Sequence, residues 1–223
     1  MSFQRARSEE QRLQRRESIL AAADAMLAEM PVAEITLTGL SRRVGLAKSN
    51  VLRYFESRED VLLELLVRSA RDWVAELGAA AAAAIDPAAP VDDRVDRIAA
   101  LFAGSAADHP GLLDLLSAQA GVLEQNVSAE AVLRFKRAVL TVMTDLATVL
   151  RTAIPELGDG ALALCAMAVS IAGALYAQAR QSEACAAAYR ADPALAVFRT
   201  DLVPALTGAF ATLISGALAR AGR

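Results

Sequence analysis

Aromatic and histidine side chains are scarce in this chain of 223 residues, in which aromatics make up 4% and histidine occurs once. Alanine, the strongest helix former, occurs 51 times, which favours helices. Strands, in contrast, are typically rich in aromatic and β-branched residues. This composition excludes an all-β fold and argues against a doubly wound sheet. Because 55% of the residues are hydrophobic and 22% are charged, a largely disordered chain is excluded as well.

Cysteine and the motifs of enzymes are also nearly absent. Cys165 and Cys185 lie twenty residues apart with no histidine nearby, which matches no zinc site and is typical of small core residues in a reducing cytosol. The sequence contains no nucleophile elbow, no P-loop and no dinucleotide-binding glycine motif. We therefore predict no enzymatic activity, no metal and no cofactor, and keep an all-helical enzyme only as an alternative.

We expect no secretion signal, because the first ten residues are largely polar and charged. The segment 160–179 is uncharged and long enough to span a bilayer. Eight of its twenty residues are alanine, however, and alanine contributes little free energy of transfer into lipid. We predict a buried helix of a cytoplasmic protein without a membrane partner, and keep a membrane-associated or scaffolding protein as an alternative.

Charge is distributed unevenly along the chain, whose net charge is −3. Residues 1–58 carry a net +3 and the remaining residues a net −6. The arginines nearest the N-terminus are Arg5, Arg7, Arg12, Arg15 and Arg16. A basic N-terminal part in an otherwise acidic chain is typical of a protein whose N-terminal part alone binds a polyanion. A chance fluctuation in the distribution of charge would produce the same pattern.

Helical periodicity extends over the whole chain and predicts about nine helices and no strand. Hydroxyl residues at Thr36, Ser57 and Ser128 are expected to cap helices, and prolines and glycines to end them. The expected helices cover residues 9–30, 37–44, 48–55, 58–85, 91–107, 112–124, 129–154, 161–189 and 194–220. Pro204 is in a position to kink the last of them.

The segment 36–55 carries the pattern that is most informative about function. It reads as a short helix, a tight turn at Gly45 and a second short helix, which is the layout of a helix-turn-helix. Val51 and Phe55 share the inner face of the second helix. The second helix also carries side chains that suit contacts with base edges and phosphates, namely Lys48, Ser49, Asn50, Arg53 and Tyr54.

This stretch resembles the DNA-binding domain of the TetR/AcrR family of transcriptional regulators over residues 12–72, without a gap. The resemblance is carried by Thr36, Leu40, Gly45, Leu46, Lys48, Tyr54, Phe55, Ser57, Arg58, Glu59, Leu62 and Leu63. The chain departs from the family pattern at Ala47, where a Ser or Thr usually caps the recognition helix, and at Leu52 and Arg53, which replace a frequent pair of tyrosines. The helical remainder resembles the family's ligand-binding and dimerisation domain in helix count and order.

The resemblance implies a division into three parts. A basic arm at 1–11 is expected to be disordered, a DNA-binding domain to cover 12–72, and an effector-binding and dimerisation domain to cover 73–223. The residues that it implies as DNA contacts are Thr36, Thr38, Arg43, Lys48, Ser49, Asn50, Arg53, Tyr54 and Arg58.

By the same resemblance, the C-terminal helices surround an effector cavity. The candidates for its lining are Trp73, Phe102, Gln119, Met143, Met167 and Tyr176. Their flat or flexible side chains suit an apolar or aromatic small molecule. For each of them, ordinary core packing is the alternative.

The last two predicted helices favour a homodimer, because one carries a stripe of small residues and the other a wide apolar face. The interface residues expected are Ala166, Ser170, Gly173 and Ala177 in the first helix and Leu206, Phe210, Leu213, Ile214 and Ala217 in the second. The alternative is that both faces are buried within one subunit.

Together these features predict a ligand-responsive, DNA-binding transcriptional regulator. We expect a repressor that binds double-stranded DNA at an inverted-repeat operator as a homodimer and is released by a small-molecule effector. An activator, or a regulator that needs its ligand to bind DNA, is the alternative within the family.

Overall fold

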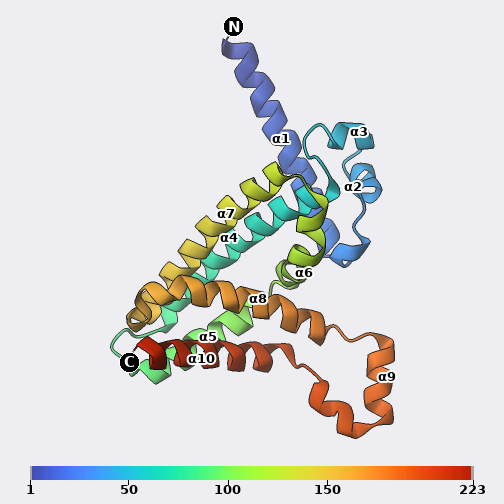
Figure 1. The fold of residues 1–223 in the computed structure, drawn as a ribbon. Coiled ribbons are helices and arrows are strands. Elements are labelled where there is room, and N and C mark those ends of the chain that lie inside the picture. Colours follow the sequence, from blue (N-terminus) through green and yellow to red (C-terminus); the bar gives the residue numbers. More distant parts are fainter. Residues whose placement is uncertain (1, 222–223) are drawn as a thin grey trace.

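The computed structural model describes residues 2–221, with side chains described from residue 9 to residue 220. Every regular element in that range is a helix, and no strand occurs there (Figure 1). The predicted all-α fold is confirmed.

The N-terminal end of the molecule consists of α1 (Ser2–Leu27), α2 (Leu37–Arg43), α3 (Lys48–Val51) and the start of α4 (Arg58–Ala84). Helix α2 begins where the Thr36 hydroxyl accepts the N–H of Gly39 at 3.0 Å, and it ends before Gly45, whose φ of 65° favours glycine. Ser57 caps α4 in the same way, because its hydroxyl accepts the N–H of Asp60 at 3.1 Å. These local signals in the sequence are confirmed.

Helix α1 reaches further toward the N-terminus than predicted. Its backbone is helical from Ser2, so the arm at 1–11 is helical over its described part rather than disordered. Gln, Arg and Glu dominate this stretch and are good helix formers, which favours continuation of the helix. The side chains of Arg5 and Arg7, named above for the arm, lie outside the described residues.

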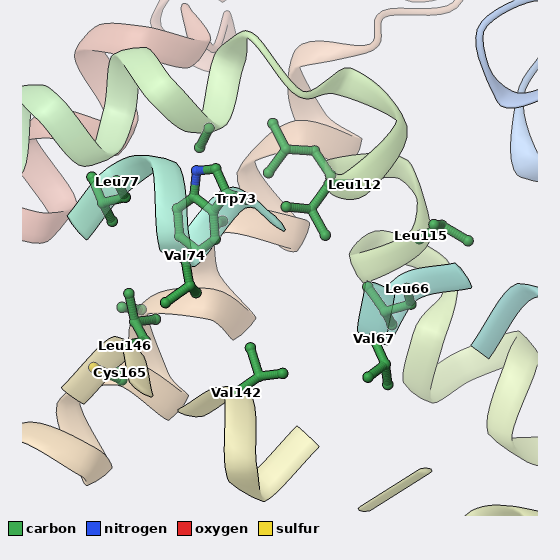
Figure 2. Close-up of a cluster of buried hydrophobic side chains, with 14 of the residues drawn as sticks. Leu66, Val67, Trp73, Val74, Leu77, Leu112, Leu115, Val142, Leu146 and Cys165 are labelled. Atoms are coloured by element: carbon green, nitrogen blue, oxygen red, sulfur yellow. The ribbon is translucent and has the colours of Figure 1, made fainter. Parts of the chain in front are cut away.

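The rest of the molecule is formed by α5 (Val91–Ala107), α6 (Pro110–Ala118), α7 (Ala129–Ala153), α8 (Ala161–Ala179), α9 (Glu183–Ala191) and α10 (Leu202–Ala221). Helices α4 and α7 lie side by side and lead from the N-terminal end to a layer that contains α5, α8 and α10 (Figure 1). Helix α6 packs against α8, and α10 packs against both α5 and α8. The core follows α4, from which Trp73 and Leu77 lie among side chains of α6, α7 and α8 (Figure 2).

The helix predicted at 161–189 is two helices. Helix α8 ends at Ala179, and α9 starts after Ser182, whose hydroxyl accepts the N–H of Cys185 at 3.2 Å. Because the sequence is alanine-rich on both sides of Ser182, its pattern predicts one continuous helix. The serine cap instead starts a new helix in another direction.

Two other predicted helices are shorter than expected. The one at 194–220 starts only at Leu202, because η5 (Pro193–Phe198) precedes it as a separate 3-10 helix. Pro204 therefore falls in the first turn of α10, where a proline breaks no helical hydrogen bond. The helix predicted at 112–124 ends at Ala118 and continues as π and 3-10 turns.

Candidate nucleic-acid interface

The helix-turn-helix formed by α2 and α3 has a small apolar interior. Val51 and Phe55 are 0% and 2% exposed, and the N–H of Leu46 in the turn donates to the carbonyl of Ser41 at 2.9 Å. The residues exposed on the outer side are Lys48, Ser49, Asn50 and Arg53, with Tyr54 half-buried beside them. The structure therefore brings five of the predicted DNA contacts onto one surface.

Helix α3 is a single turn and is shorter than the predicted 48–55. No side chain caps its N-terminus, because Ala47 stands at the cap position. After Val51 the backbone continues in tighter turns, in which the N–H of Arg53 donates to the carbonyl of Asn50 at 3.3 Å. So short a helix has little stability of its own and depends on its neighbours.

Arg16 of α1 supplies part of that support. Its guanidinium donates to the Tyr54 carbonyl, pairs with Glu64 of α4 and lies over the Phe55 ring, 4.2 Å from the centroid. Burial raises the pKa of the Glu64 carboxyl, and Arg16 opposes that shift. From the sequence, Arg16 was identifiable only as one of the arginines nearest the N-terminus, because its partners depend on how α1 packs against α4.

Two arginines predicted to contact DNA are engaged within the protein. Arg43 is exposed but forms a bidentate pair with Glu29, at 2.5 and 2.6 Å, and the hydrogen bond from Arg43 lowers the pKa of the Glu29 carboxyl. Arg58 points into the fold, where it donates to the Val32 carbonyl at 2.8 Å and lies 3.4 Å from Glu59. The structure does not support the prediction of a DNA contact for Arg58, because its first-turn position in α4 directs it toward the turn before α2.

A groove of about 770 Å³ runs between α1 and the turn that joins α3 to α4. Arg12, Arg16 and Arg53 line it together with Glu9 and other residues. The exposed Arg12, named above only among the arginines nearest the N-terminus, thus lies on the same groove as Arg53. Also exposed at the start of α2 are Thr36 and Thr38.

Trp73 and Phe102, two of the residues predicted to line an effector cavity, are buried core residues. Their rings meet edge to face with centroids 5.0 Å apart, and the indole N–H of Trp73 is buried with no acceptor among the residues that the structure describes. The apolar cavity beside Phe102, enclosed by α4, α5, α7, α8 and α10, has a volume of about 20 Å³. A cavity of that size holds no drug-sized ligand.

Phe102 is the one candidate of the six that lines that cavity; Trp73 and the other four do not. Met167 is 50% exposed, on the side of α8 away from the buried Cys165, so the structure contradicts its place in an enclosed cavity. Gln119 lies in the turn after α6, where its amide donates to Glu124 at 2.7 Å. Met143 and Tyr176 are half-buried.

The residues predicted for the dimer interface divide into two groups. Buried inside the subunit are Gly173, Leu206, Phe210 and Ile214. A Cβ on Gly173 would lie 3.1 Å from the carbonyl carbon of Leu116 in α6, and the Phe210 ring packs against Phe102 of α5. The structure contradicts the interface prediction for these four, because the faces they mark pack on α5 and α6. At the surface remain the exposed Ala166, Ser170 and Ala177 and the half-buried Leu213 and Ala217.

The outer faces of α8 and α10 are uncharged. Helix α8 has no charged residue, and Arg220 is the one charged residue of α10. By length and composition alone, Pro155–Ala179 and Leu202–Arg220 could each cross a membrane. Only 33% and 17% of the residues in their most apolar stretches are buried, so the buried helix predicted at 160–179 is buried on one face only.

A comparison with protein families identifies the fold. Residues 67–221 match the family described as tetracyclin repressor-like, C-terminal domain, which is more than half of the chain. The chain belongs to the TetR family. The match begins inside α4, which runs without a break from the N-terminal end into the C-terminal part of this TetR-family protein.

Solved structures of TetR-family regulators share the fold. The fatty acid degradation regulator FadR from Bacillus halodurans has a TM-score of 0.53 at 14% identity, covering 90% of this chain and 97% of that one. A TetR transcriptional regulator from Rhodococcus sp. RHA1 has a TM-score of 0.53 at 15% identity, covering 92% and 96%. One from Mesorhizobium loti has a TM-score of 0.51 at 14% identity, covering 94% and 97%. No curated protein matches the chain by sequence.

Proposed function

We propose that this TetR-family protein is a cytoplasmic transcriptional repressor that binds an inverted-repeat operator as a homodimer and is released by a small-molecule effector. The observation that carries the proposal is the exposed surface of α3, where Lys48, Asn50 and Arg53 face solvent while Val51 is buried. A recognition helix reads base edges in the major groove with such outward polar side chains at its N-terminal end.

The exposed side chains have separate tasks in this proposal. The amide of Asn50 has the geometry that pairs bidentately with adenine, and the guanidinium of Arg53 has the geometry that pairs with guanine. Lys48 at the start of α3 suits a phosphate or a guanine. The residues proposed for contacts to the DNA backbone are Ser49, Tyr54, Thr36, Thr38 and Arg43, the last by exchanging its pair with Glu29 for a phosphate.

The proposed dimer forms through the uncharged outer faces of α8 and α10. Ala166, Ser170 and Ala177 allow close approach to the backbone of α8, and Leu213 and Ala217 continue the apolar surface on α10. Because α8 and α10 pack side by side, two copies related by a two-fold axis would form a four-helix interface. A monomer would leave this uncharged surface in water, which soluble proteins rarely do.

The proposed effector site lies in the core beside Phe102 and Phe210. The cavity there has a wholly apolar lining, which suits an apolar or aromatic small molecule. Since its volume is about 20 Å³, the effector would bind a state in which the surrounding helices have separated. Binding would draw the population away from the compact state, to an extent set by the difference in affinity for the two states.

Selection of DNA from a random library by the purified protein tests the proposal. We expect enrichment of an inverted repeat with half-sites one helical turn apart, about 34 Å between centres. No enrichment at low salt would contradict DNA binding, and enrichment of single half-sites would contradict the dimer. A reporter gene under the selected operator then distinguishes a repressor from an activator or a ligand-dependent binder, by the sign of the response to the protein alone.

A further inference from the structure

An open groove lies between the C-terminal halves of α4 and α7, the two helices that run side by side in Figure 1. We call it the α4–α7 groove. Its volume is about 300 Å³, at the lower end of the range for small-molecule sites. Its walls are formed by Gly78, Ala81 and Ala82 of α4 and by Thr148, Val149 and Thr152 of α7.

The groove exists because small residues of α4 face α7 and because the two helices are tied together beyond it. The buried guanidinium of Arg94 donates to the carbonyl of Ala89 at 3.0 Å and to the carbonyl of Ala153 at 2.9 Å. Ala89 lies in the turn between α4 and α5, and Ala153 is the last residue of α7. The walls are therefore held in place, and their side chains are too small to fill the space between them.

Val149 separates this groove from the cavity of about 20 Å³ beside Phe102, which we call the inner cavity. The side chain of Val149 lines both spaces. A Cβ on Gly78 would lie 3.1 Å from the Cγ2 atom of Val149, so the glycine leaves the space that the valine occupies. Because a valine in a helix strongly prefers one rotamer, this partition is closed until the side chain or its helix moves.

The lining defines the class of molecule that fits. Among the residues that the structure describes, no charged side chain lines the α4–α7 groove or the inner cavity. The hydroxyls of Thr148 and Thr152 each donate to a backbone carbonyl one turn earlier at 2.9 Å, so they can only accept a hydrogen bond from a ligand. Thr148 already accepts one from Arg151 at 3.3 Å, which favours Thr152 as the acceptor. The groove therefore suits a neutral molecule with an apolar body and one hydroxyl or N–H group.

We propose that the α4–α7 groove is the entrance through which such a neutral, apolar small molecule reaches the inner cavity, with Val149 as its gate. The inference rests on the effector of the proposed function and names its route and chemical class. Displacement of Val149 joins the two spaces, so a molecule seated in the groove favours the open state by the contacts that it gains there.

The thiol of Cys165 lines the inner cavity and reports on the entrance (Figure 2). In the full chain with Cys185→Ser, which removes the exposed thiol, mass spectrometry follows the reaction of Cys165 with methyl methanethiosulfonate, a small neutral reagent. Ala82→Trp should fill the groove and slow this reaction by about tenfold. Ala83→Trp is the matched control, because Ala83 is equally exposed on α4 but does not line the groove, and it should leave the rate unchanged.

Removal of the gate should have the opposite effect. Val149→Ala should speed the reaction of Cys165 by about tenfold, because it opens the inner cavity to the groove. Leu146→Ala is the matched control for lost packing, because Leu146 is buried, lines the inner cavity alone and loses more atoms. Entry by general loosening of the core would make Leu146→Ala the faster variant, whereas entry through the groove makes Val149→Ala the faster one.

Benzyl alcohol and benzoate test the class of ligand. Benzyl alcohol at millimolar concentration should occupy the groove and slow the reaction of Cys165. Benzoate has the same ring with a negative charge, and it should leave the rate unchanged because no cation lines the described groove. Equal protection by the two compounds would overturn the neutral class.

The entrance and the effector of the proposed function can fail separately. An Ala82→Trp variant that reacts like Ala83→Trp, or a Val149→Ala variant that reacts no faster than Leu146→Ala, overturns the entrance. These reactions need neither operator nor effector. A protein that binds its operator but is released by no small molecule overturns the effector, whatever the rates measured at Cys165.

Discussion

The carboxylate of Asp114 on α6 lies 2.5 Å from the guanidinium of Arg180, at the point where α8 ends. Its other oxygen accepts the backbone N–H of Val32 at 2.6 Å, in the turn that precedes α2. Asp114 is 9% exposed and the Arg180 side chain is 42% exposed, so the link between the C-terminal helices and the helix-turn-helix is buried at Asp114 and open to solvent at Arg180. A displacement of α6 or α8 relative to the N-terminal helices would act on this one side chain.

The first prediction concerns that link. Asp114→Ala should lower the free energy of unfolding by about 1–3 kcal/mol, because the buried N–H of Val32 loses its acceptor. Arg180→Ala leaves the Val32 bond in place and removes a partly exposed ion pair, so it should cost less than about 1 kcal/mol. Urea unfolding of both variants measures the difference. Equal stability of the two variants would mean that the Val32 contact contributes nothing.

Arg16 is expected to affect DNA binding without touching DNA. Arg16→Ala frees the Tyr54 carbonyl and the end of α3, so operator affinity should fall by about tenfold while its dependence on salt stays the same. Lys48→Ala is the matched comparison, for which the salt slope should become shallower by about one. Fluorescence anisotropy over a salt series measures both quantities. A shallower slope for Arg16→Ala would show that Arg16 contacts a phosphate.

The proposed reading residues should change specificity. Asn50→Ala and Arg53→Ala should each cost about 1–3 kcal/mol of binding free energy and relax the preference at one base pair in each half-site. Arg58→Ala removes the donor to the Val32 carbonyl, so it should lower stability and weaken all operator variants alike. Competition between operators with single base changes distinguishes the two behaviours. A uniform loss for Asn50→Ala and Arg53→Ala would remove them from the reading surface.

Variants at Gly173 and at Ala166 distinguish the effect of packing within the subunit from the effect of dimerisation. Gly173→Ala places a Cβ 3.1 Å from the Leu116 carbonyl carbon, so the free energy of unfolding should fall by about 1–3 kcal/mol while the dimer persists. Ala166→Glu combined with Ala177→Glu places charges on the exposed face of α8 and should give helical monomers, because like charges would meet across a two-fold axis. Sedimentation and circular dichroism report the two properties. A charged variant that still dimerises would place the interface elsewhere.

The two cysteines should differ in reactivity. Burial raises the pKa of the Cys165 thiol from its ordinary value of 9.0 to about 12, whereas Cys185 is exposed on α9. At pH 8 a thiol reagent should modify one cysteine in the folded protein and both after denaturation. Because the unfolded thiol loses its proton near pH 9 and the folded one near 12, the contribution of Cys165 to stability should fall as the pH rises between these values. Rapid modification of both thiols in the folded state would show that Cys165 is accessible.

The sequence by itself determined where several helices begin and which sides of them are apolar. The caps at Thr36, Ser57 and Ser128 each act within a few residues, so they form whatever the rest of the chain does. The buried side of α3 follows in the same way, because Val51 and Phe55 are one helical turn apart. The outline of the helix-turn-helix and its outward side chains were therefore predictable.

Only the tertiary structure decided which neighbour each apolar side of a helix packs against, and which side stays exposed. Phe210 and Met167 are both apolar residues on uncharged helices, yet Phe210 packs on α5 while Met167 is half exposed on α8. Arg16 and Arg58 both belong to the basic N-terminal part, yet both are engaged in holding the fold. Helical periodicity and capping are local, whereas burial depends on how helices cross, which is set by contacts between residues far apart in the sequence.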